Sequence, residues 1–162
     1  MMAFTHAATG VFIGLGIARL THAPHAMTLA MLAGGFAGSL LPDIDHPQSW
    51  LGRRIPFVSI PLSLLIGHRG ATHSAMVLFL TLAGALAFAG TAGASGGLLA
   101  AFSGALCAGY ASHLAADWLT PSGIPLLWPN PRRFKSRVTV QIGSLAEYSL
   151  AGVLWLVVVA MA

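Results

Sequence analysis

The chain has 162 residues, the length of a single domain. Hydrophobic residues make up 56% of it, charged residues only 7%, and the mean hydropathy is +0.80, which excludes an ordinary soluble domain and favours several transmembrane helices. The net charge of +4 is carried mainly by loops, where it predicts membrane orientation rather than nucleic acid binding. No basic residue precedes the first apolar run at residues 11–18, so we expect a retained helix there and not a signal peptide.

Five apolar segments predict an all-α, polytopic membrane helix bundle forming one domain over residues 1–162. They cover residues 4–20, 26–41, 72–89, 98–119 and 145–161. Several are shorter than the roughly 20 residues that usually cross a bilayer, so we expect little tilt or local thinning of the membrane. A further apolar stretch, residues 57–67, is too short to cross and contains Pro61, so an interfacial or re-entrant segment is expected.

The positions of lysine and arginine predict the orientation of the bundle. Two long loops, residues 42–71 and 120–144, carry seven of the eight basic residues, and Arg19 is the eighth. With five spans, both loops lie on the same side of the membrane as the N-terminus. The positive-inside rule makes that side cytoplasmic.

Most acidic residues and histidines fall at this same predicted end of the bundle. They are His6, Asp43, Asp45, His46, His68, His73, His113, Asp117 and Glu147. Only His22 and His25 fall at the other end, where we expect solvated loop side chains. The orientation was derived from arginine and lysine alone, so this clustering is an independent observation, and it predicts one metal site at a membrane surface.

Each group of these residues also has a structural interpretation. His113 and Asp117 are one helical turn apart, which suits a shared metal or a hydrogen-bonded helix-end pair. Burying an acid at this depth without a partner is costly, so the spacing favours the metal. Asp43 and His46 are expected ligands, whereas Asp45 is a helix-end cap, a bridging ligand or a general base.

Thr72 and Arg69, near the end of the first long loop, and Glu147, in the last apolar segment, are interpreted separately. Thr72 is expected to cap the helix over residues 72–89. Arg69, between two histidines, is either a surface charge or a contact for an anion, and we expect the latter as a catalytic role. Ser144 and Glu147 have the spacing of a capping box, which requires no metal.

The types of side chain indicate which metals suit the site. Histidine and carboxylate ligands suit zinc, manganese or iron, and a chain with one cysteine has no cluster for a closed structural zinc site. The number of candidates exceeds one tetrahedral site, so two or three ions are expected, most simply Zn.

At these positions the chain resembles the YdjM-like family of bacterial inner-membrane proteins, described as metal-dependent hydrolases. The resemblance covers nearly the whole chain. It rests on Thr5-His6 before Gly10, Leu41-Pro42-Asp43-Ile44-Asp45-His46, His68-Arg69-Gly70-x-Thr72-His73-Ser74, His113-x-x-x-Asp117-x-x-Thr120-Pro121-x-Gly123-Ile124, Leu127-Trp128-Pro129 and Gly143-Ser144-x-x-Glu147. It implies location in the bacterial inner membrane, metal-dependent hydrolysis, and Glu147 as a ligand in addition to a cap.

The order of ligands is also distantly similar to that of zinc-dependent phospholipases C, although the chain begins with Met where those enzymes use an N-terminal Trp. The expected function is therefore hydrolysis of a phosphate ester, from a phospholipid or lipid-linked phosphate, at the cytoplasmic membrane face. Membrane lipids are the expected partners. A divalent-metal transporter, or a metal-binding adaptor without catalysis, is the alternative from another class.

Overall fold

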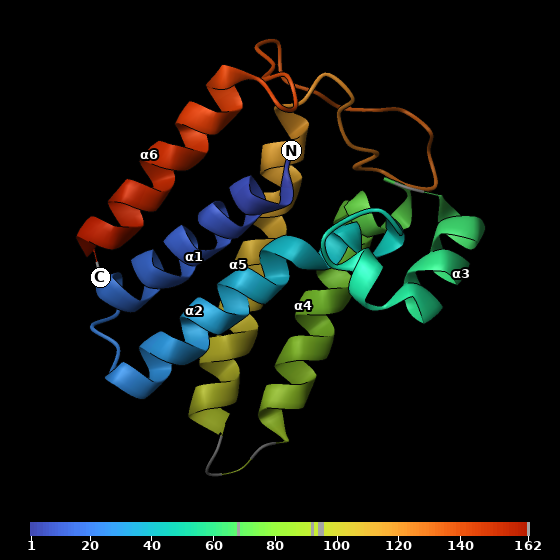
Figure 1. Ribbon diagram of the computed structural model, residues 1–162. Helices are drawn as coiled ribbons and strands as arrows, with labels where there is room; N and C mark the ends of the chain where they lie inside the picture. Colours follow the sequence, from blue (N-terminus) through green and yellow to red (C-terminus); the bar gives the residue numbers. More distant parts are fainter. Residues whose placement is uncertain (68, 92, 94–95, 162) are drawn as a thin grey trace.

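The computed structural model describes residues 1–67, 69–91, 93 and 96–161 of the chain. In these residues the fold is all-α, and pairing of extended backbone is limited to one isolated bridge between Ile124 and Phe134. The helices are α1 (Ala3–Leu20), α2 (His25–Leu40), α3 (Pro56–Ile66), α4 (Ala75–Gly90), α5 (Gly96–Trp118) and α6 (Leu145–Met161), as Figure 1 shows. Three short 3-10 segments, η1 (Leu41–Asp45), η2 (Gly52–Arg54) and η3 (Ala71–His73), lie in and around the first long loop.

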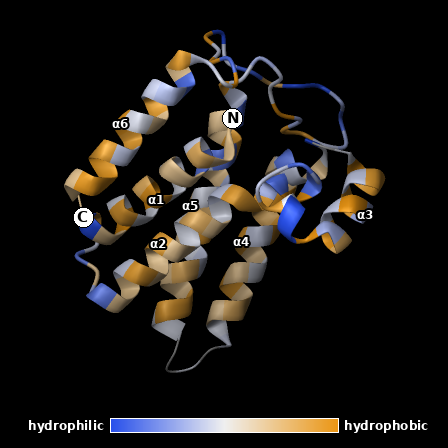
Figure 2. Cartoon of the chain, in the orientation of Figure 1, coloured by the Kyte–Doolittle hydropathy of each residue, from blue (hydrophilic) through white to orange (hydrophobic). Residues whose placement is uncertain are grey.

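Three of the helical segments are long and apolar enough to cross a membrane. They are α1, the continuous stretch His25–Asp45 formed by α2 and η1, and α5. The apolar helices α4 and α6 have 16 and 17 residues, so the count of five spans stays a prediction. Figure 2 shows hydrophobic residues along all these helices. The prediction of a membrane helix bundle is confirmed, and the short segment predicted near residues 57–67 is α3.

The three long segments pack against one another and form the centre of the bundle. Helix α2 contacts both α1 and α5, α4 packs on α5, and α6 packs on α1. Helices α1, α4 and α6 begin at the end of the bundle where α2 and α5 finish (Figure 1). All four acidic residues and the described histidines of the predicted cluster lie at this end, whereas His22 and His25 border the opposite turn.

One helix start differs from the prediction. Helix α4 begins at Ala75, and its N-cap is Ser74, whose Oγ accepts a hydrogen bond from the Val77 backbone nitrogen at 3.3 Å. Thr72 was expected to be the cap, but it lies in η3, and its hydroxyl is directed to Asp45 and His73 instead. The prediction of a Thr72 cap was wrong because a buried carboxylate is available to this hydroxyl.

Glycines allow α2 and α5 to approach at backbone distance. A Cβ atom built on Gly38 would collide with the carbonyl group of Leu106, and one on Gly109 would collide with the carbonyl oxygen of Gly35. Small residues at such crossings permit close helix packing in membranes. This approach sets the position of α5 relative to η1, and therefore of His113 relative to Asp43.

Replacing Gly38 with alanine is expected to destabilise the protein. The added methyl group meets backbone atoms that cannot rotate away, and overpacking of this kind costs about 1–3 kcal/mol. Gly104→Ala on α5 is the matched control, because no neighbour lies near its Cβ position, and alanine there is expected to be neutral or slightly stabilising. Thermal unfolding midpoints in detergent measure both variants, and an equal effect of the two would contradict the close packing.

Candidate metal centre

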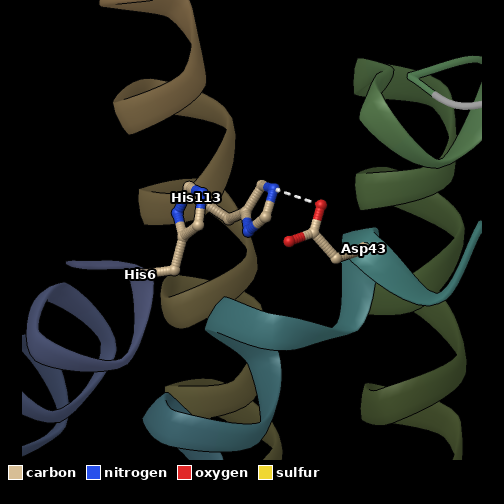
Figure 3. Close-up of side chains that lie close together, drawn as sticks. All are labelled: His6, Asp43 and His113. Atoms are coloured by element: carbon tan, nitrogen blue, oxygen red, sulfur yellow. Dashed lines mark ion pairs between the residues drawn. The ribbon is translucent and has the colours of Figure 1, made fainter. Parts of the chain in front are cut away.

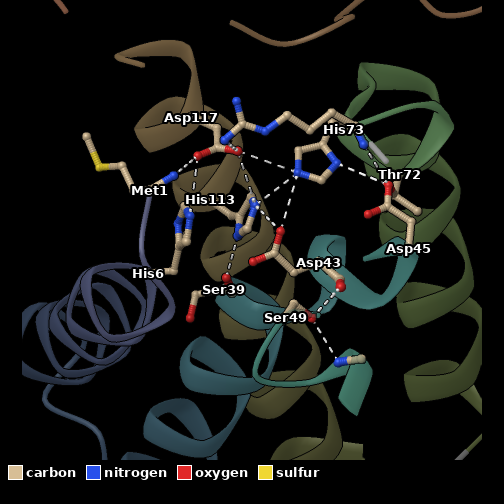
Figure 4. A network of polar contacts seen from close by, with 12 residues as sticks. Met1, His6, Ser39, Asp43, Asp45, Ser49, Thr72, His73, His113 and Asp117 are labelled. Carbon is tan, nitrogen blue, oxygen red and sulfur yellow. Dashed lines mark hydrogen bonds and ion pairs between the residues drawn. The ribbon is translucent and has the colours of Figure 1, made fainter. Parts of the chain in front are cut away.

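Side chains from four segments converge at the loop-bearing end of the bundle. Helix α5 contributes His113 and Asp117 in its last turns, η1 contributes Asp43, η3 contributes His73, and α1 contributes His6. The three histidines and Asp117 are at most 1% exposed, and the Asp43 side chain is 15% exposed. Figure 4 shows these side chains directed toward one another. Asp43 is therefore the ligand nearest to solvent.

Two imidazole nitrogens and two carboxylate oxygens lie close together in this cluster. His73 Nε2 and His113 Nε2 are 3.2 Å apart. Asp43 Oδ1 lies 3.8 Å and 3.7 Å from these two nitrogens, and Asp117 Oδ2 lies 3.6 Å and 3.8 Å from them. Ligand atoms around a tetrahedral zinc ion, with bonds of about 2.0–2.1 Å, are separated by about 3.3–3.4 Å. The two nitrogens have nearly this spacing, and the carboxylate oxygens lie a few tenths of an ångström farther from them.

Hydrogen bonds on the far side of each imidazole determine where its lone pair points. His113 Nδ1 lies 2.7 Å from the carbonyl oxygen of Ser39, so this nitrogen must carry a proton and donate it. Thr72 Oγ1 donates to Asp45, so it accepts from His73 Nδ1, 3.0 Å away. In the neutral imidazoles, both Nε2 atoms then offer lone pairs to the space between them, which could be filled by a metal ion or a shared proton.

His6 is the fifth member of the cluster. Its ring stacks on that of His113 with a centroid distance of 3.7 Å and an interplanar angle of 13° (Figure 3). His6 Nε2 is 3.4 Å from Asp117 Oδ1, but among the described residues neither ring nitrogen has a partner with hydrogen-bond geometry. Asp117 Oδ1 also contacts the Met1 backbone nitrogen. Because a buried imidazole ordinarily has partners, His6 suits a ligand of a further ion.

The donor set fits a divalent metal, and the number of ions remains a prediction. The residues offer two groups, His73, His113 and Asp117, and His6, Asp43 and His113. His113 belongs to both, yet its Nδ1 is engaged by Ser39, so its Nε2 serves one ion. His73, His113 and Asp117 could hold one ion with Asp43 nearby, and a second ion would depend on His6 and on carboxylates shared between ions.

Asp45 is located behind His73 and not among the ligand atoms. Its Oδ2 accepts hydrogen bonds from Thr72 Oγ1 and, at 3.1 Å, from the Arg69 backbone nitrogen, and it lies 3.5 Å from His73 Nδ1. These contacts place Asp45 in support of His73, and its expected roles as bridging ligand or general base stay predictions. A carboxylate at the second nitrogen of a ligating histidine fixes the ring and raises its basicity.

Replacing Asp45 with asparagine is expected to weaken metal binding about 10–100-fold without removing the site. The amide keeps an oxygen for Thr72 and Arg69 but lacks the charge that supports His73. Competition with a chelator of known affinity measures the change. An affinity equal to that of the wild type would exclude the orienting role, and a loss as large as that of His73→Ala would make Asp45 a direct ligand.

Arg69 connects the cluster to the second long loop. Its Nη2 lies 2.7 Å from Asp117 Oδ2, and its Nη1 donates to Thr120 Oγ1 at 3.2 Å. The residue is 9% exposed and has a positive φ of 55°. The alternative of a surface charge is thereby excluded, because the guanidinium is fixed beside the ligands.

Two predicted ligands lie outside both groups of candidate ligands, and a third falls outside the described residues. Glu147 accepts hydrogen bonds from the backbone nitrogens of Met2 and Gly143 at 2.6 Å and 2.7 Å, and from Thr5 Oγ1 at 3.1 Å. Within the described chain it joins neither metal group, and its contacts are those of a helix cap and tether. His46 lines the mouth of the site next to Asp43. His68 falls outside the described residues.

Replacing Glu147 with glutamine is expected to lower stability and leave the metal content unchanged. The new amide group would oppose a backbone N–H donor, and losing a buried hydrogen bond to a charged group costs about 1.5–3 kcal/mol. Unfolding midpoints and elemental analysis of the same preparation test both parts. Loss of metal in a folded Glu147→Gln protein would establish it as a ligand.

Several contributors were not identified from the sequence. Ser39 takes part through its backbone carbonyl, which no side-chain pattern reveals. The Tyr110 hydroxyl donates to the Thr72 carbonyl and so holds η3 beside α5. Tyr110 precedes His113 by one helical turn, a spacing that could have pointed to it. Ser49 Oγ donates to the Asp43 carbonyl at 2.8 Å and stabilises η1.

Two surface cavities meet at Arg69, beside the cluster. The mouth, a cavity of about 510 Å³, is lined by Asp43, His46, Arg53 and Arg69 together with apolar residues. A second cavity of about 470 Å³ is lined by Arg69, Ser122, Arg133 and Ile142. Three arginines therefore border the approaches to a group of carboxylates and imidazoles, and an anionic ligand is favoured there.

The fold and this cluster define an integral membrane protein with a candidate metal centre at one end of its helix bundle. Residues 1–162 match the model of the family described as YdjM inner membrane protein, and the chain belongs to that family. The family and the three long apolar helices place it in the inner membrane.

Individual relatives agree with this assignment. The chain is 44% identical over 101 residues to the inner membrane protein YdjM of Escherichia coli (strain K12), and equally to that of Shigella flexneri, a match covering 62% of this chain and 50% of each relative. It is 35% identical over 117 residues to YvsG of Bacillus subtilis (strain 168), covering 72% of this chain and 68% of YvsG. The chain thus spans about half the length of the YdjM relatives. No solved structure matches it, and the similarity to phospholipases C stays a prediction.

Proposed function

We propose that this inner membrane protein is a metal-dependent hydrolase that cleaves a phosphate ester of a lipid or lipid-linked phosphate at the cytoplasmic membrane face. The observation that carries the proposal is the pair of imidazole Nε2 atoms of His73 and His113, 3.2 Å apart and beside two carboxylates. The Ser39 carbonyl fixes the tautomer of His113, and Thr72 together with Asp45 fixes the tautomer of His73. Such preorganised ligands are typical of a catalytic metal site that is partly open to solvent.

The residues divide into ligands and groups that bind substrate. His73, His113, Asp43 and Asp117 would hold a divalent ion such as zinc, with His6 available to a second. When bound, such an ion supplies Lewis acidity that polarises a phosphoryl oxygen and activates water near neutral pH. Arg69, already beside Asp117, would bind phosphoryl oxygens and stabilise the charge that develops on them.

The mouth of the site orients the substrate. Arg53 and Arg69 line it together with Asp43, so a phosphate entering there meets two guanidinium groups before it reaches the cluster. His46 lines the same cavity and is suited to protonate a leaving group. Most residues of the cluster are buried, which limits the entry of water from other directions.

The placement of ionisable residues favours hydrolysis over metal transport. A transporter is expected to place ligands near the membrane midplane and along an exit path. In this sequence, the helical stretches between the cluster and the far ends of the helices, residues 7–18, 26–38, 76–90, 96–112 and 148–161, contain no acid, histidine, lysine or arginine. A metal bound at the cluster therefore has no second set of ligands along the bundle.

The proposal is tested by assaying the purified protein, loaded with Zn²⁺ or Mn²⁺, for release of phosphate or headgroup. The substrates are p-nitrophenyl phosphate, phosphatidic acid and phosphatidylglycerol in mixed micelles. We expect hydrolysis of at least one, its loss in Asp43→Asn, and its retention in His25→Ala, which changes a histidine at the opposite end. A folded, metal-loaded protein without activity on any of them would favour a binding or transport role.

A further inference from the structure

An apolar slot lies next to the mouth of the candidate metal centre. It has a volume of about 190 Å³, and its walls include Phe4, Phe36, Leu40, Trp50 and Trp155. It shares Ala3, Phe4 and Trp50 with the mouth, so the two cavities adjoin one another. The slot lies among α1, α2 and α6, and charged residues line the mouth but not the slot.

Aromatic contacts hold the walls of the slot in position. Phe36 and Trp50 meet edge to face with a centroid distance of 6.1 Å, and Phe4 stacks on Tyr148 at 5.7 Å. The Arg54 guanidinium lies 3.6 Å from the Trp50 ring centroid, in cation–π contact. Yet Phe4, Phe36, Trp50 and Trp155 each remain 37–38% exposed. These rings thus offer a preformed apolar surface that this chain itself does not cover.

The two adjoining cavities favour different chemical groups, and a ligand that fills both would have to carry both kinds of group. The slot is lined by aromatic and aliphatic side chains, where a charged group would lose its hydration without compensation. The mouth contains Asp43, His46, Arg53 and Arg69, which suit an anion and a metal ion. A ligand that fills both is an amphiphile with a phosphate at one end and hydrocarbon at the other.

We propose that the slot binds the hydrocarbon chain of the substrate, so that the protein selects phosphate esters carrying a chain directly beside the phosphate. The hydrolytic step rests on the proposed function, whereas binding of an alkyl phosphate does not. Hydrocarbon in the slot would hold the phosphate between Arg53, Arg69 and the ligands of the cluster. The slot would thereby determine specificity and contribute affinity through removal of apolar surface from water.

Binding is measured by quenching of tryptophan fluorescence in nanodiscs, with a dodecyl phosphate brominated along its chain. The protein carries Trp118→Phe and Trp128→Phe, so that Trp50 and Trp155 report on the slot. We expect saturable quenching, with affinity about tenfold weaker in Phe36→Ala, a loss typical of truncating an aromatic contact. Phe79→Ala is the matched control, because Phe79 is an exposed ring of α4, outside the slot.

The outcomes separate the slot from the hydrolase proposal. The proposal that the slot binds the hydrocarbon chain would be contradicted if the Phe36→Ala and Phe79→Ala variants bound the alkyl phosphate with equal affinity. Equal quenching by a brominated alkane without phosphate would also contradict it. If the protein hydrolyses phosphate esters, Phe36→Ala should raise KM for dodecyl phosphate about tenfold relative to KM for p-nitrophenyl phosphate. An unchanged KM ratio would also overturn it. Specific binding of the alkyl phosphate without any hydrolysis would support the binding role of the slot and contradict the proposed hydrolase function.

Discussion

Replacing His113 with alanine is expected to reduce metal affinity by more than about 100-fold, beyond the usual effect of changing an outer-shell residue. The change removes one of two imidazole nitrogens that face the same point, and it also leaves the Ser39 carbonyl without its donor. The remaining His73, Asp43 and Asp117 form an incomplete tetrahedral set. Competition between the protein and a chelator of known affinity measures the loss.

The matched control for this variant is His25→Ala. His25 begins α2 at the opposite end of the bundle, so its removal should leave metal affinity unchanged. His73→Ala is a second ligand variant that should behave like His113→Ala, which guards against a folding defect specific to α5. Metal affinity equal to that of the wild type in folded His113→Ala would exclude this histidine as a ligand.

Replacing Arg69 with glutamine is expected to destabilise the metal-free protein by about 3–5 kcal/mol, the usual effect of breaking a buried ion pair. The Arg69 guanidinium lies 2.7 Å from Asp117 Oδ2, and the two side chains are 10% and 1% exposed. Without it, two carboxylates face the cluster with less positive charge. A metal ion should then restore stability, by about 2.7 kcal/mol at a free concentration 100 times its Kd.

The same variant should lose hydrolysis of phosphate esters by about 10²–10³-fold, as for the removal of other groups that stabilise transition-state charge. Unfolding midpoints with and without metal, followed by kinetic assays, test both effects. Arg137→Gln, which changes an exposed arginine in the long loop before α6, should show neither. A metal-free Arg69→Gln protein as stable as the wild type would contradict the buried ion pair.

Hydropathy alone located most of the helices, because a segment without charges in this chain has few alternatives to a membrane helix. The predicted span 145–161 coincides with α6, and the other four differ from their helices by at most three residues at either end. The starts of helices were less predictable where two nearby side chains can each serve as the N-cap. Thr72 has the composition of a cap, but a buried Asp45 engages its hydroxyl, and Ser74 caps α4 instead.

The convergence of His6, Asp43, His73, His113 and Asp117 followed from topology, because alternating helices bring their loop-bearing ends together. The separate roles of the residues within the cluster did not follow from topology. Asp43 and Asp45 are two residues apart, yet one faces the other ligands and the other lies behind His73, a difference set by the path of η1. Glu147 had two interpretations from its spacing, and its hydrogen bonds are those of the cap.

The central claim is that these side chains form a metal centre, and the metal content of the purified protein tests it most directly. Elemental analysis by mass spectrometry should be performed on protein prepared without chelators and resupplied with zinc, manganese or iron. We expect at least one tightly bound ion per chain, lost in His73→Ala and His113→Ala and retained in His25→Ala. A folded wild-type protein that retains no ion after resupply would contradict the claim, and the facing imidazoles would then have to share a proton.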